Sequence, residues 1–189
     1  MKSKGLLVAI AAPSGTGKTT VCHELMKRDN RFVFSVSCTT RPPRPNERDG
    51  VDYHFISREQ FQKNIREGKM AEWQEIFGNY YGTLKETIEK ALRDGKILLL
   101  DLDVKGTLNL KKNYPDQLIS IFLLPPSDTE LDRRLQKRGV DDPSSIAIRK
   151  ARIPDELELS EQFDFQIVND NLETTVNKII NIIEEHLKK

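Results

Sequence analysis

Cysteine is scarce in this sequence of 189 residues, which has two of them. Cys22 and Cys38 are too few for a disulfide framework, and their spacing does not match a metal site. Reduced thiols are usual in cytoplasmic proteins, because the thiol pool there keeps cysteine reduced. We therefore expect a cytoplasmic protein in which neither cysteine has a role.

Long hydrophobic runs are missing as well, since no run approaches the roughly 18 apolar residues that span a bilayer. The short apolar run after the N-terminal lysines could be mistaken for a secretory signal, but it fits a buried parallel strand equally well. The net charge is only +1, so the total charge does not favour a polyanion. We expect neither nucleic acid nor a membrane as a partner, and any phosphate site must come from locally clustered Arg and Lys.

Internal repeats and low-complexity segments are also absent, and the length suits one sizeable core. Apolar runs alternate with helical patterns, which is typical of an α/β protein with a mainly parallel sheet. The expected core strands are Leu6–Ala11, Phe32–Val36, Ile97–Asp101, Leu118–Leu124 and Phe165–Val168. Helix starts are expected at the capping boxes Ser57 with Gln60, Thr83 with Glu86 and Ser127 with Glu130, at Asp142-Pro143, and at about Leu172 for a last helix that reaches Leu187.

The stretch Ala11–Thr20, AAPSGTGKTT, follows the first expected strand and nearly fits the phosphate-binding pattern G-x-x-x-x-G-K-[ST]. In that pattern backbone N–H groups surround a phosphate chain, a lysine reaches its outer phosphates and a hydroxyl binds Mg²⁺. Lys18 and Thr19 would supply these two groups, and Gly15 and Gly17 stand where the backbone must turn sharply. The alternative, a glycine-rich turn with a surface lysine, leaves the rest of the string unexplained.

Three arginines, Arg41, Arg44 and Arg48, lie within eight residues of one another in a proline-rich stretch. The forked guanidinium group matches phosphate oxygens, so two or three arginines in one loop can enclose a monophosphate. The alternative is a solvated basic loop that Glu47 and Asp49 balance.

Two carboxylates, Asp101 and Asp103, end the most apolar of the expected strands. Ligands of open parallel sheets bind beyond the carboxyl ends of the strands, which favours a functional role. Capping of the next helix by Asp103 is the alternative.

A further set of arginines lies in the last third of the chain. Arg134 and Arg138 are one helical turn apart, and Arg149 and Arg152 follow. Such arginines can stabilise the charge on a transferring phosphoryl group. They could instead belong to an exposed helix that forms salt bridges with nearby acidic residues.

The chain resembles the guanylate kinase family in an ordered set of motifs that runs from about residue 5 to residue 187. Besides the phosphate-binding loop, the motifs are SVSCTTRPPRPNERDGVDYHF (35–55), EW (72–73), GNYYGT (78–83), LLLDLDVKG (98–106), LPPS (124–127), RLQKRG (134–139) and VND (168–170). Each motif alone is weak, but their shared order and spacing make the resemblance specific.

The resemblance implies an α/β P-loop kinase fold, with a parallel core sheet flanked by helices, a small GMP-binding insertion and a mobile helical lid. One domain would span residues 1–189, with its core at about 5–36, 97–125 and 160–187, the GMP-binding region at about 37–96 and the lid at about 126–159. The implied reaction is transfer of the γ-phosphoryl group of ATP to GMP, and also to dGMP, within purine nucleotide metabolism. Mg²⁺ would accompany ATP as cofactor, and the oligomeric state is left open.

The resemblance also implies a role for each residue that matches a motif. ATP would be bound by Ala12, Pro13, Ser14, Gly15, Thr16, Gly17, Lys18, Thr19, Thr20, Arg134 and Asn169, with Thr19 on the metal. GMP would be bound by Ser37, Arg41, Arg44, Glu47, Tyr53, Glu72, Tyr81, Thr83, Asp101 and Asp103. The catalytic residues would be Lys18, Arg44, Arg138 and Arg149.

In the family a carboxylate at the position of Glu72 faces guanine, and Asn169 would lie near the adenine of ATP. Guanine presents its N1–H and N2 amine on one edge, so one carboxylate can accept both, whereas adenine lacks this donor pair. A polar group left unpaired by the wrong base discriminates strongly against that base. For Glu72 taken alone, a solvated carboxylate on a strand is the alternative.

Two positions depart from the family. Ala12 replaces the first glycine of the phosphate-binding loop, which costs little if its φ is negative and strains the loop if it is positive. Pro154 falls where the family continues a helix after Arg149, and proline breaks a helix interior. We therefore expect the lid helix to end near Arg152.

Two other classes of function stay open at this stage. Guanylate-kinase-like domains of scaffold proteins bind phosphorylated peptides, but they usually lack an intact triphosphate loop. Another small P-loop kinase would act on a different monophosphate or on a sugar phosphate. The joint presence of Ser37, Glu72 and Thr83 argues against that second class.

Overall fold

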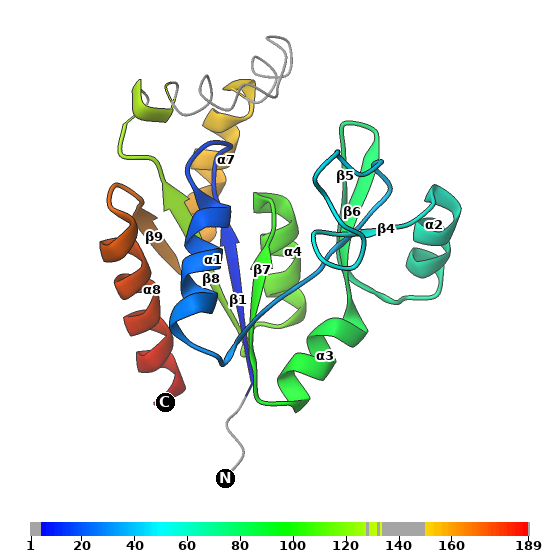
Figure 1. Ribbon diagram of the computed structural model, residues 1–189, viewed down its shortest axis with the longest axis horizontal. Helices are drawn as coiled ribbons and strands as arrows, with labels where there is room; N and C mark the ends of the chain where they lie inside the picture. The colour runs from blue at the N-terminus through cyan, green and yellow to red at the C-terminus, as the bar shows by residue number, and fades with distance from the viewer. Residues whose placement is uncertain (1–4, 128, 132, 134–149, 189) are drawn as a thin grey trace.

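Five parallel strands form the core sheet of the computed structural model, which describes residues 5–127, 129–131, 133 and 150–188 (Figure 1). Their spatial order is β2-β7-β1-β8-β9, and each pair of neighbours runs parallel. The strands are β1 (Leu6–Ala11), β2 (Phe32–Phe34), β7 (Ile97–Asp101), β8 (Leu118–Leu124) and β9 (Phe165–Val168). The predicted α/β class with a parallel core sheet is confirmed.

The prediction for the second strand was too long, because β2 ends at Phe34 and not at Val36. The backbone N–H of Ser35 still donates to the carbonyl of Leu99, 2.8 Å away. After this bond the chain leaves the core sheet and crosses to a second sheet, so Val36 has no strand neighbour in the core.

Helices cover both faces of the core sheet (Figure 1). Side chains of β1 point alternately to the two faces: Leu6 packs with Val21 and Val176, and Leu7 packs with Ile88 and Leu110. This double burial explains why β1, β7 and β8 are nearly continuous apolar runs. The helices around the core are α1 (Lys18–Arg28), α3 (Lys85–Arg93), α4 (Val104–Asn113), α7 (Ile153–Leu159) and α8 (Leu172–Leu187).

A second, smaller sheet has the order β4-β3-β6-β5 and stands beside the core (Figure 1). It is mixed, because β3 pairs parallel with β4 but antiparallel with β6, and β5 and β6 form an antiparallel hairpin. One helix, α2, follows β4 and buries Phe61 under the sheet. Its elements are β3 (Cys38–Thr39), β4 (His54–Phe55), α2 (Arg58–Arg66), β5 (Met70–Ile76) and β6 (Asn79–Leu84).

Two of the helix starts predicted at capping boxes are confirmed by their N-cap hydrogen bonds. The backbone N–H of Gln60 donates to Ser57 Oγ at 3.1 Å, and that of Glu130 donates to Ser127 Oγ at 3.1 Å. The box at Thr83 is wrong: Thr83 belongs to β6, and α3 begins at Lys85 after Leu84, which makes no side-chain cap.

The reason is that the Thr83 hydroxyl is already engaged. Thr83 Oγ1 donates to the carboxylate of Glu72 on the neighbouring strand at 2.8 Å, so it is turned away from the first turn of α3. The start predicted at Asp142-Pro143 lies outside the described residues.

Pro154 lies in the first turn of α7, where its missing N–H has no helical partner to lose. Lys150 and Ala151 are helical, Arg152 is a turn residue, and α7 begins at Ile153. The predicted break of the helix near Arg152 is therefore confirmed.

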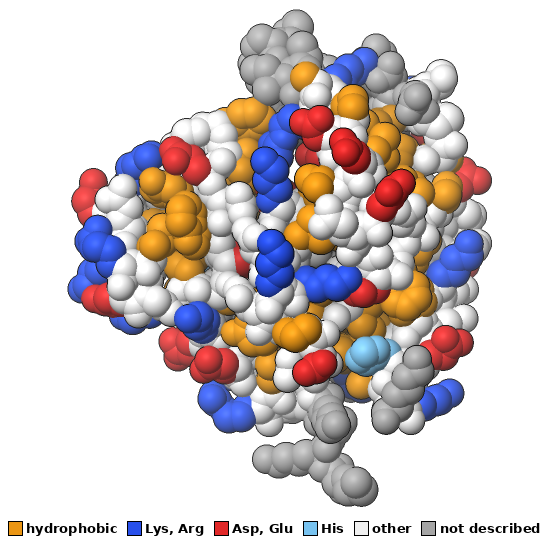
Figure 2. All heavy atoms as spheres, turned by 180° about the vertical axis from the view of Figure 1, so that it is seen from behind, with side chains coloured by type: hydrophobic (Ala, Val, Ile, Leu, Met, Phe, Trp, Pro, Cys, Tyr) orange, Lys and Arg blue, Asp and Glu red, His pale blue; other side chains and the backbone are white. Residues whose placement is uncertain are grey.

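On the face in Figure 2, Lys and Arg side chains lie among Asp and Glu side chains, in keeping with the small net charge. Among the described residues, no helix is both long enough and apolar enough to cross a bilayer. Both cysteines are buried and free.

Candidate active site

A cavity of about 350 Å³ opens at the carboxyl end of the core strands and extends to the smaller sheet. It gathers the phosphate-binding loop, the end of β7, the arginine-rich loop between β3 and β4, and the β5–β6 hairpin. The predicted site residues that line it are Ala12, Pro13, Ser14, Gly15, Gly17, Lys18, Thr19, Ser37, Arg41, Arg44, Glu47, Tyr53, Glu72, Tyr81, Asp101 and Asp103. Most of the predicted residues therefore face one shared space, although they come from distant parts of the chain.

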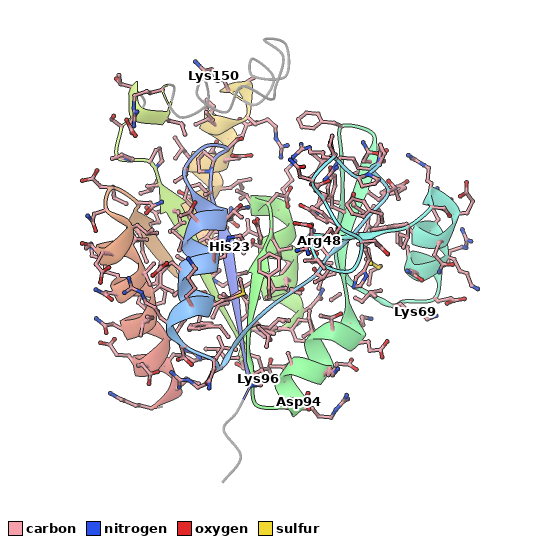
Figure 3. All side chains as sticks on the ribbon, in the orientation of Figure 1. His23, Arg48, Lys69, Asp94, Lys96 and Lys150 are labelled. Carbon is pink, nitrogen blue, oxygen red and sulfur yellow. The ribbon has the colours of Figure 1, made fainter. Side chains whose placement is uncertain are left out.

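Several predicted residues do not line this cavity. Among the described ones these are Thr16, Thr20, Thr83 and Asn169, while Arg134, Arg138 and Arg149 lie outside the described residues. Arg48, labelled in Figure 3, shares the arginine-rich loop but is exposed and does not line the cavity. Its backbone N–H donates to Asp52 Oδ2 at 2.8 Å.

The phosphate-binding loop takes the backbone shape that its glycines allow. Gly15 has φ 93° and Gly17 has φ 98°, a region that side chains rarely adopt, and Gly17 leads directly into α1. Ala12 is not in this region, since Phe77 is the one described residue other than glycine with positive φ. The alanine in the glycine position therefore causes no backbone strain, and its methyl group packs against the core.

Asn169, which directly follows β9, holds this loop by a hydrogen bond but does not line the cavity. Its side-chain Nδ2 donates to the carbonyl of Thr16 at 2.7 Å, and its backbone N–H donates to the carbonyl of Leu124 at 2.8 Å. A Cβ atom on Gly17 would lie 3.0 Å from the same Nδ2. The geometry thus gives the buried Asn169 a contact with the loop itself, which sequence reasoning did not foresee.

Lys18 points into the cavity and meets the end of β7. Its Nζ lies 2.6 Å from Asp101 Oδ1 and donates to the carbonyl of Leu102 at 2.8 Å. Burial alone would lower the pKa of Lys18, but the adjacent Asp101 carboxylate outweighs burial and the pKa is raised. The lysine therefore stays charged inside the cavity.

The arginine-rich loop is built around one two-pronged ion pair. Arg41 donates through both terminal nitrogens to Glu47 at 2.8 Å, and these bonds hold the pKa of Glu47 below its usual value. Glu47 also accepts from the backbone N–H of Arg44 at 2.7 Å. The paired side chains are only 15% and 16% exposed, so the alternative of a solvated basic loop does not hold for Arg41.

Two tyrosines complete this side of the cavity. The Tyr53 ring lies 5.4 Å from the Arg41 guanidinium and meets the Tyr81 ring edge-on at 6.1 Å. Burial raises the pKa of Tyr53, as does the nearby charge of Asp101. These hydroxyl groups and the arginines suit a ligand with a compact negative charge.

Glu72 is a buried carboxylate, 6% exposed, and not the solvated strand residue that its sequence alone allowed. Burial raises its pKa to about 7, and the charge of Asp103 adds to this, although the hydrogen bond from Thr83 acts in the opposite direction. Gly106 permits the close approach of α4, because a Cβ there would lie 2.9 Å from Glu72 Oε2. Such a carboxylate suits a ligand that donates two hydrogen bonds.

Asp103 has both of the roles considered for it. It caps α4 by accepting from the backbone N–H of Gly106 at 2.7 Å, and it also lines the cavity. Asp101, by contrast, caps no helix and pairs with Lys18.

Eight further cavity residues were not predicted as site residues: Gln74, Ile76, Phe77, Gly82, Leu102, Val104, Arg152 and Glu156. Burial raises the pKa of Glu156, and Arg152 partly offsets it. A sequence signal exists for Phe77, since phenylalanine precedes Gly78 where hairpin turns favour Asn-Gly. Glu156 has no comparable signal, because only the packing of α7 brings it to the cavity.

No group of three or more His, Cys, Asp or Glu side chains able to hold a metal ion occurs in the described part of the chain. Thr19, at the start of α1, and Asp101 both line the cavity. A site with so few protein oxygens is suitable for Mg²⁺, because this ion keeps several waters and takes further ligands from substrate phosphates.

Comparison with known proteins gives a consistent picture. The family model described as guanylate kinase matches residues 4–186. A guanylate kinase of Chlorobaculum tepidum is 48% identical over 97% of this chain and 94% of its own length, and one of Thermotoga maritima is 41% identical over 98% and 89%. The crystal structure of guanylate kinase from Anaplasma phagocytophilum superposes with a TM-score of 0.83 at 32% identity, covering 100% of this chain and 89% of that one.

Proposed function

Because this chain belongs to the guanylate kinase family, we propose that it transfers the γ-phosphoryl group of ATP to GMP, giving ADP and GDP. One observation carries the proposal. A single cavity holds the phosphate-loop lysine Lys18 together with the buried carboxylate Glu72 and the arginines Arg41 and Arg44. Lys18 matches the donor phosphates, the two arginines match the acceptor phosphate, and Glu72 matches the acceptor base.

The acceptor base is read by Glu72. Its carboxylate accepts the N1–H and the N2 amine of guanine, and Thr83 keeps the Oε1 atom in place with its 2.8 Å bond. Asp103 faces the same part of the cavity and accepts from the base as well. Adenine has no such donor pair, so AMP leaves a buried carboxylate unpaired and binds poorly.

The acceptor phosphate is bound by Arg41 and Arg44, with Ser37, Tyr53 and Tyr81 around it. Glu47 acts through Arg41, because two hydrogen bonds to Glu47 hold the Arg41 guanidinium group in position. No general base is needed, because the attacking phosphate oxygen is already ionised at neutral pH. Catalysis therefore consists of in-line positioning and neutralisation of charge.

The donor ATP is bound by the loop 12–20, whose backbone N–H groups and Lys18 hold its phosphates. Lys18 leaves its contact with Asp101 to reach the outer phosphates, where its charge stabilises the transition state. Asn169 keeps the loop in shape through Thr16. Thr19, with Asp101 nearby, would hold Mg²⁺ on the triphosphate, where it supplies charge neutralisation.

Three regions share this work in our proposal: a core at about 5–36, 97–125 and 160–187, a GMP-binding region at about 37–96, and a lid at about 126–159. The lid supplies Arg138 and Arg149 to the transferring phosphoryl group, with Arg134 beside ATP; all three lie outside the described residues. Closure would exclude water, which prevents hydrolysis of ATP.

We also propose that dGMP is a substrate, because it has the same base and phosphate as GMP, and these are the parts that the residues above bind. The reaction belongs to purine nucleotide metabolism, and the free buried thiols Cys22 and Cys38 fit work in the reducing cytoplasm.

A panel of nucleoside monophosphates tests the proposal by ADP release at fixed ATP and Mg²⁺. GMP should have the highest kcat/KM, followed by dGMP, and AMP should be lower than GMP by orders of magnitude. A higher kcat/KM for another monophosphate would indicate a different small kinase. ADP release with none of them, together with binding of a phosphorylated peptide, would indicate an interaction module.

A further inference from the structure

The tip of the β5–β6 hairpin has an unfavourable residue for its turn. Ile76 pairs with Asn79, so Phe77 and Gly78 form a two-residue loop, with φ 50° and φ 73°. Positive φ at both positions is typical of the type I′ turn, which favours Asn-Gly, and it strains a bulky side chain. Phe77 is also 59% exposed, so neither turn geometry nor burial explains a phenylalanine here.

A contact across the cavity does explain it. The Arg152 guanidinium lies 5.7 Å from the centre of the Phe77 ring, within the range of a cation–π interaction. The two residues are far apart in the sequence and come from different parts of the molecule, the hairpin from the smaller sheet and Arg152 from the start of α7 (Figure 1). Both line the cavity.

Arg152 has two acidic neighbours as well. Its Nη2 atom lies 3.8 Å from Asp103 Oδ2 and 3.6 Å from Glu156 Oε1. It therefore links three elements, because Asp103 caps α4, Glu156 belongs to α7 and Phe77 directly follows β5. The planar guanidinium group can face a ring and carboxylates together.

The three contacts surround the base end of the proposed acceptor pocket. Glu72 lies on β5, the strand that leads to Phe77. Its Oε2 atom is close to Gly106, whose N–H bonds to Asp103, and Asp103 is the residue that Arg152 approaches. A shift of the hairpin relative to α4 would therefore move Glu72 away from this arrangement.

We propose that Phe77 and Arg152 form a clasp that holds the hairpin carrying Glu72 against α4 and α7, and so positions the guanine reader. The clasp rests on the proposed function, and both of its members are positioning residues that act through Glu72. Their loss should weaken GMP binding more than ATP binding, because the phosphate-binding loop belongs to the core and does not touch the hairpin tip.

Kinetics of four variants test the clasp. Phe77→Asn removes the ring but supplies the residue that the turn prefers, so its melting temperature should equal or exceed that of the wild type. Phe77→Asn and Arg152→Gln should each raise the KM for GMP about twofold to fivefold, the effect of one cation–π contact at an exposed site, and leave the KM for ATP unchanged. Arg152→Lys keeps a cation over the ring and should restore part of the affinity.

The double variant decides whether the pair acts as a unit, because its KM for GMP should be no higher than that of either single variant. Arg28→Gln is the matched control, since Arg28 also pairs with two carboxylates, Glu24 and Glu173, but does not line the cavity. Its KM for GMP should stay at the wild-type value.

Unchanged KM for GMP in the single variants, or a double variant whose effect is the product of both, would overturn the clasp. A wild-type enzyme that does not phosphorylate GMP would instead overturn the proposed function, so the two failures are distinct.

Discussion

Glu72 gives the clearest consequence at the scale of single residues. Its carboxylate must be ionised to accept two hydrogen bonds from guanine, but burial raises its pKa to about 7. A pKa near neutrality therefore makes the guanine reader sensitive to modest changes in pH, which an ordinary glutamate would not be.

We predict that the KM for GMP rises as the pH falls below about 7, by up to about tenfold per pH unit, because protonated Glu72 no longer accepts both donors. The KM for ATP should not follow this trend. The measurement is both KM values between pH 6 and pH 8.5.

Protonation of the GMP phosphate, whose second pKa is near 6, also contributes at the acidic end of this range. The Glu72→Gln variant separates the two causes, because it keeps the phosphate effect and has no carboxylate to titrate. The prediction fails if wild type and Glu72→Gln show the same pH dependence.

The roles of some residues depend on their neighbours in the sequence, and the roles of others depend on contacts between distant segments. The phosphate-binding loop and Lys18 could be predicted, because the pattern of the loop is set by neighbours in the sequence. The contact of Asn169 with Thr16 could not, since it joins residues 153 positions apart. Phe77 and Arg152 meet for the same kind of reason, and a single sequence does not show which distant segments pack together.

At the scale of elements, the approach of α4 to β5 determines whether Glu72 can face the cavity. Gly106 stands at the closest point, where an added Cβ would lie 2.9 Å from Glu72 Oε2 and 2.8 Å from Asp103 Oδ1. Both distances are too short for real contacts, so either the helix or the carboxylates must move.

We predict that Gly106→Ala raises the KM for GMP at least about tenfold, which corresponds to the loss of one hydrogen bond to a charged group. The fold should survive, because alanine is about 1 kcal/mol better than glycine in a helix. The measurements are the KM values for GMP and ATP and the melting temperature.

Lys105→Ala is the control, since Lys105 is exposed on the first turn of the same helix. It should leave the KM for GMP unchanged. If Gly106→Ala also behaves like wild type, the close approach of α4 does not position Glu72.

Elements were predicted well where burial sets their pattern, and less well at their ends. The core strands β1, β7 and β8 matched, because burial on both faces gives nearly continuous apolar runs, and the more exposed edge strand β9 matched as well. The end of β2 and the start of α3 did not, since a tertiary crossing ends the strand and a cross-strand bond engages Thr83. Neither the crossing of the chain nor the cross-strand hydrogen bond can be predicted from the helix and strand propensities of nearby residues.

At the scale of the whole molecule, the cavity lies between two sheets, so a ligand that fills it contacts both. In our proposal GMP meets the smaller sheet through Glu72 and the arginine-rich loop, and the core through Asp103. Binding to the folded form alone stabilises it by mass action.

We predict that GMP at about 100 times its Kd stabilises the protein by about 2.7 kcal/mol. This corresponds to a rise in melting temperature of about 5 to 10 °C for a chain of this size. Thermal unfolding with and without GMP, in the absence of ATP, measures it.

Two variants locate the effect. Lys18→Ala should keep the GMP-induced rise, because Lys18 serves the donor phosphates, while Arg44→Met should lose most of it. Each rise is taken relative to the same variant without ligand. If Lys18→Ala alone lost the GMP-induced rise in melting temperature, GMP would bind beside Lys18 and not beside Arg44, and the proposed acceptor site would be wrong.

The smaller sheet has a consequence for how such enzymes could be rebuilt. Cys38, in its first strand, pairs with Gly82, near the end of its last strand, so the chain enters and leaves this region at nearly the same point. Residues 38–84 are thus one uninterrupted cassette with adjoining ends, which carries Glu72, Thr83 and the arginine-rich loop. Recombination could exchange this cassette for another and give the same phosphate donor a new acceptor.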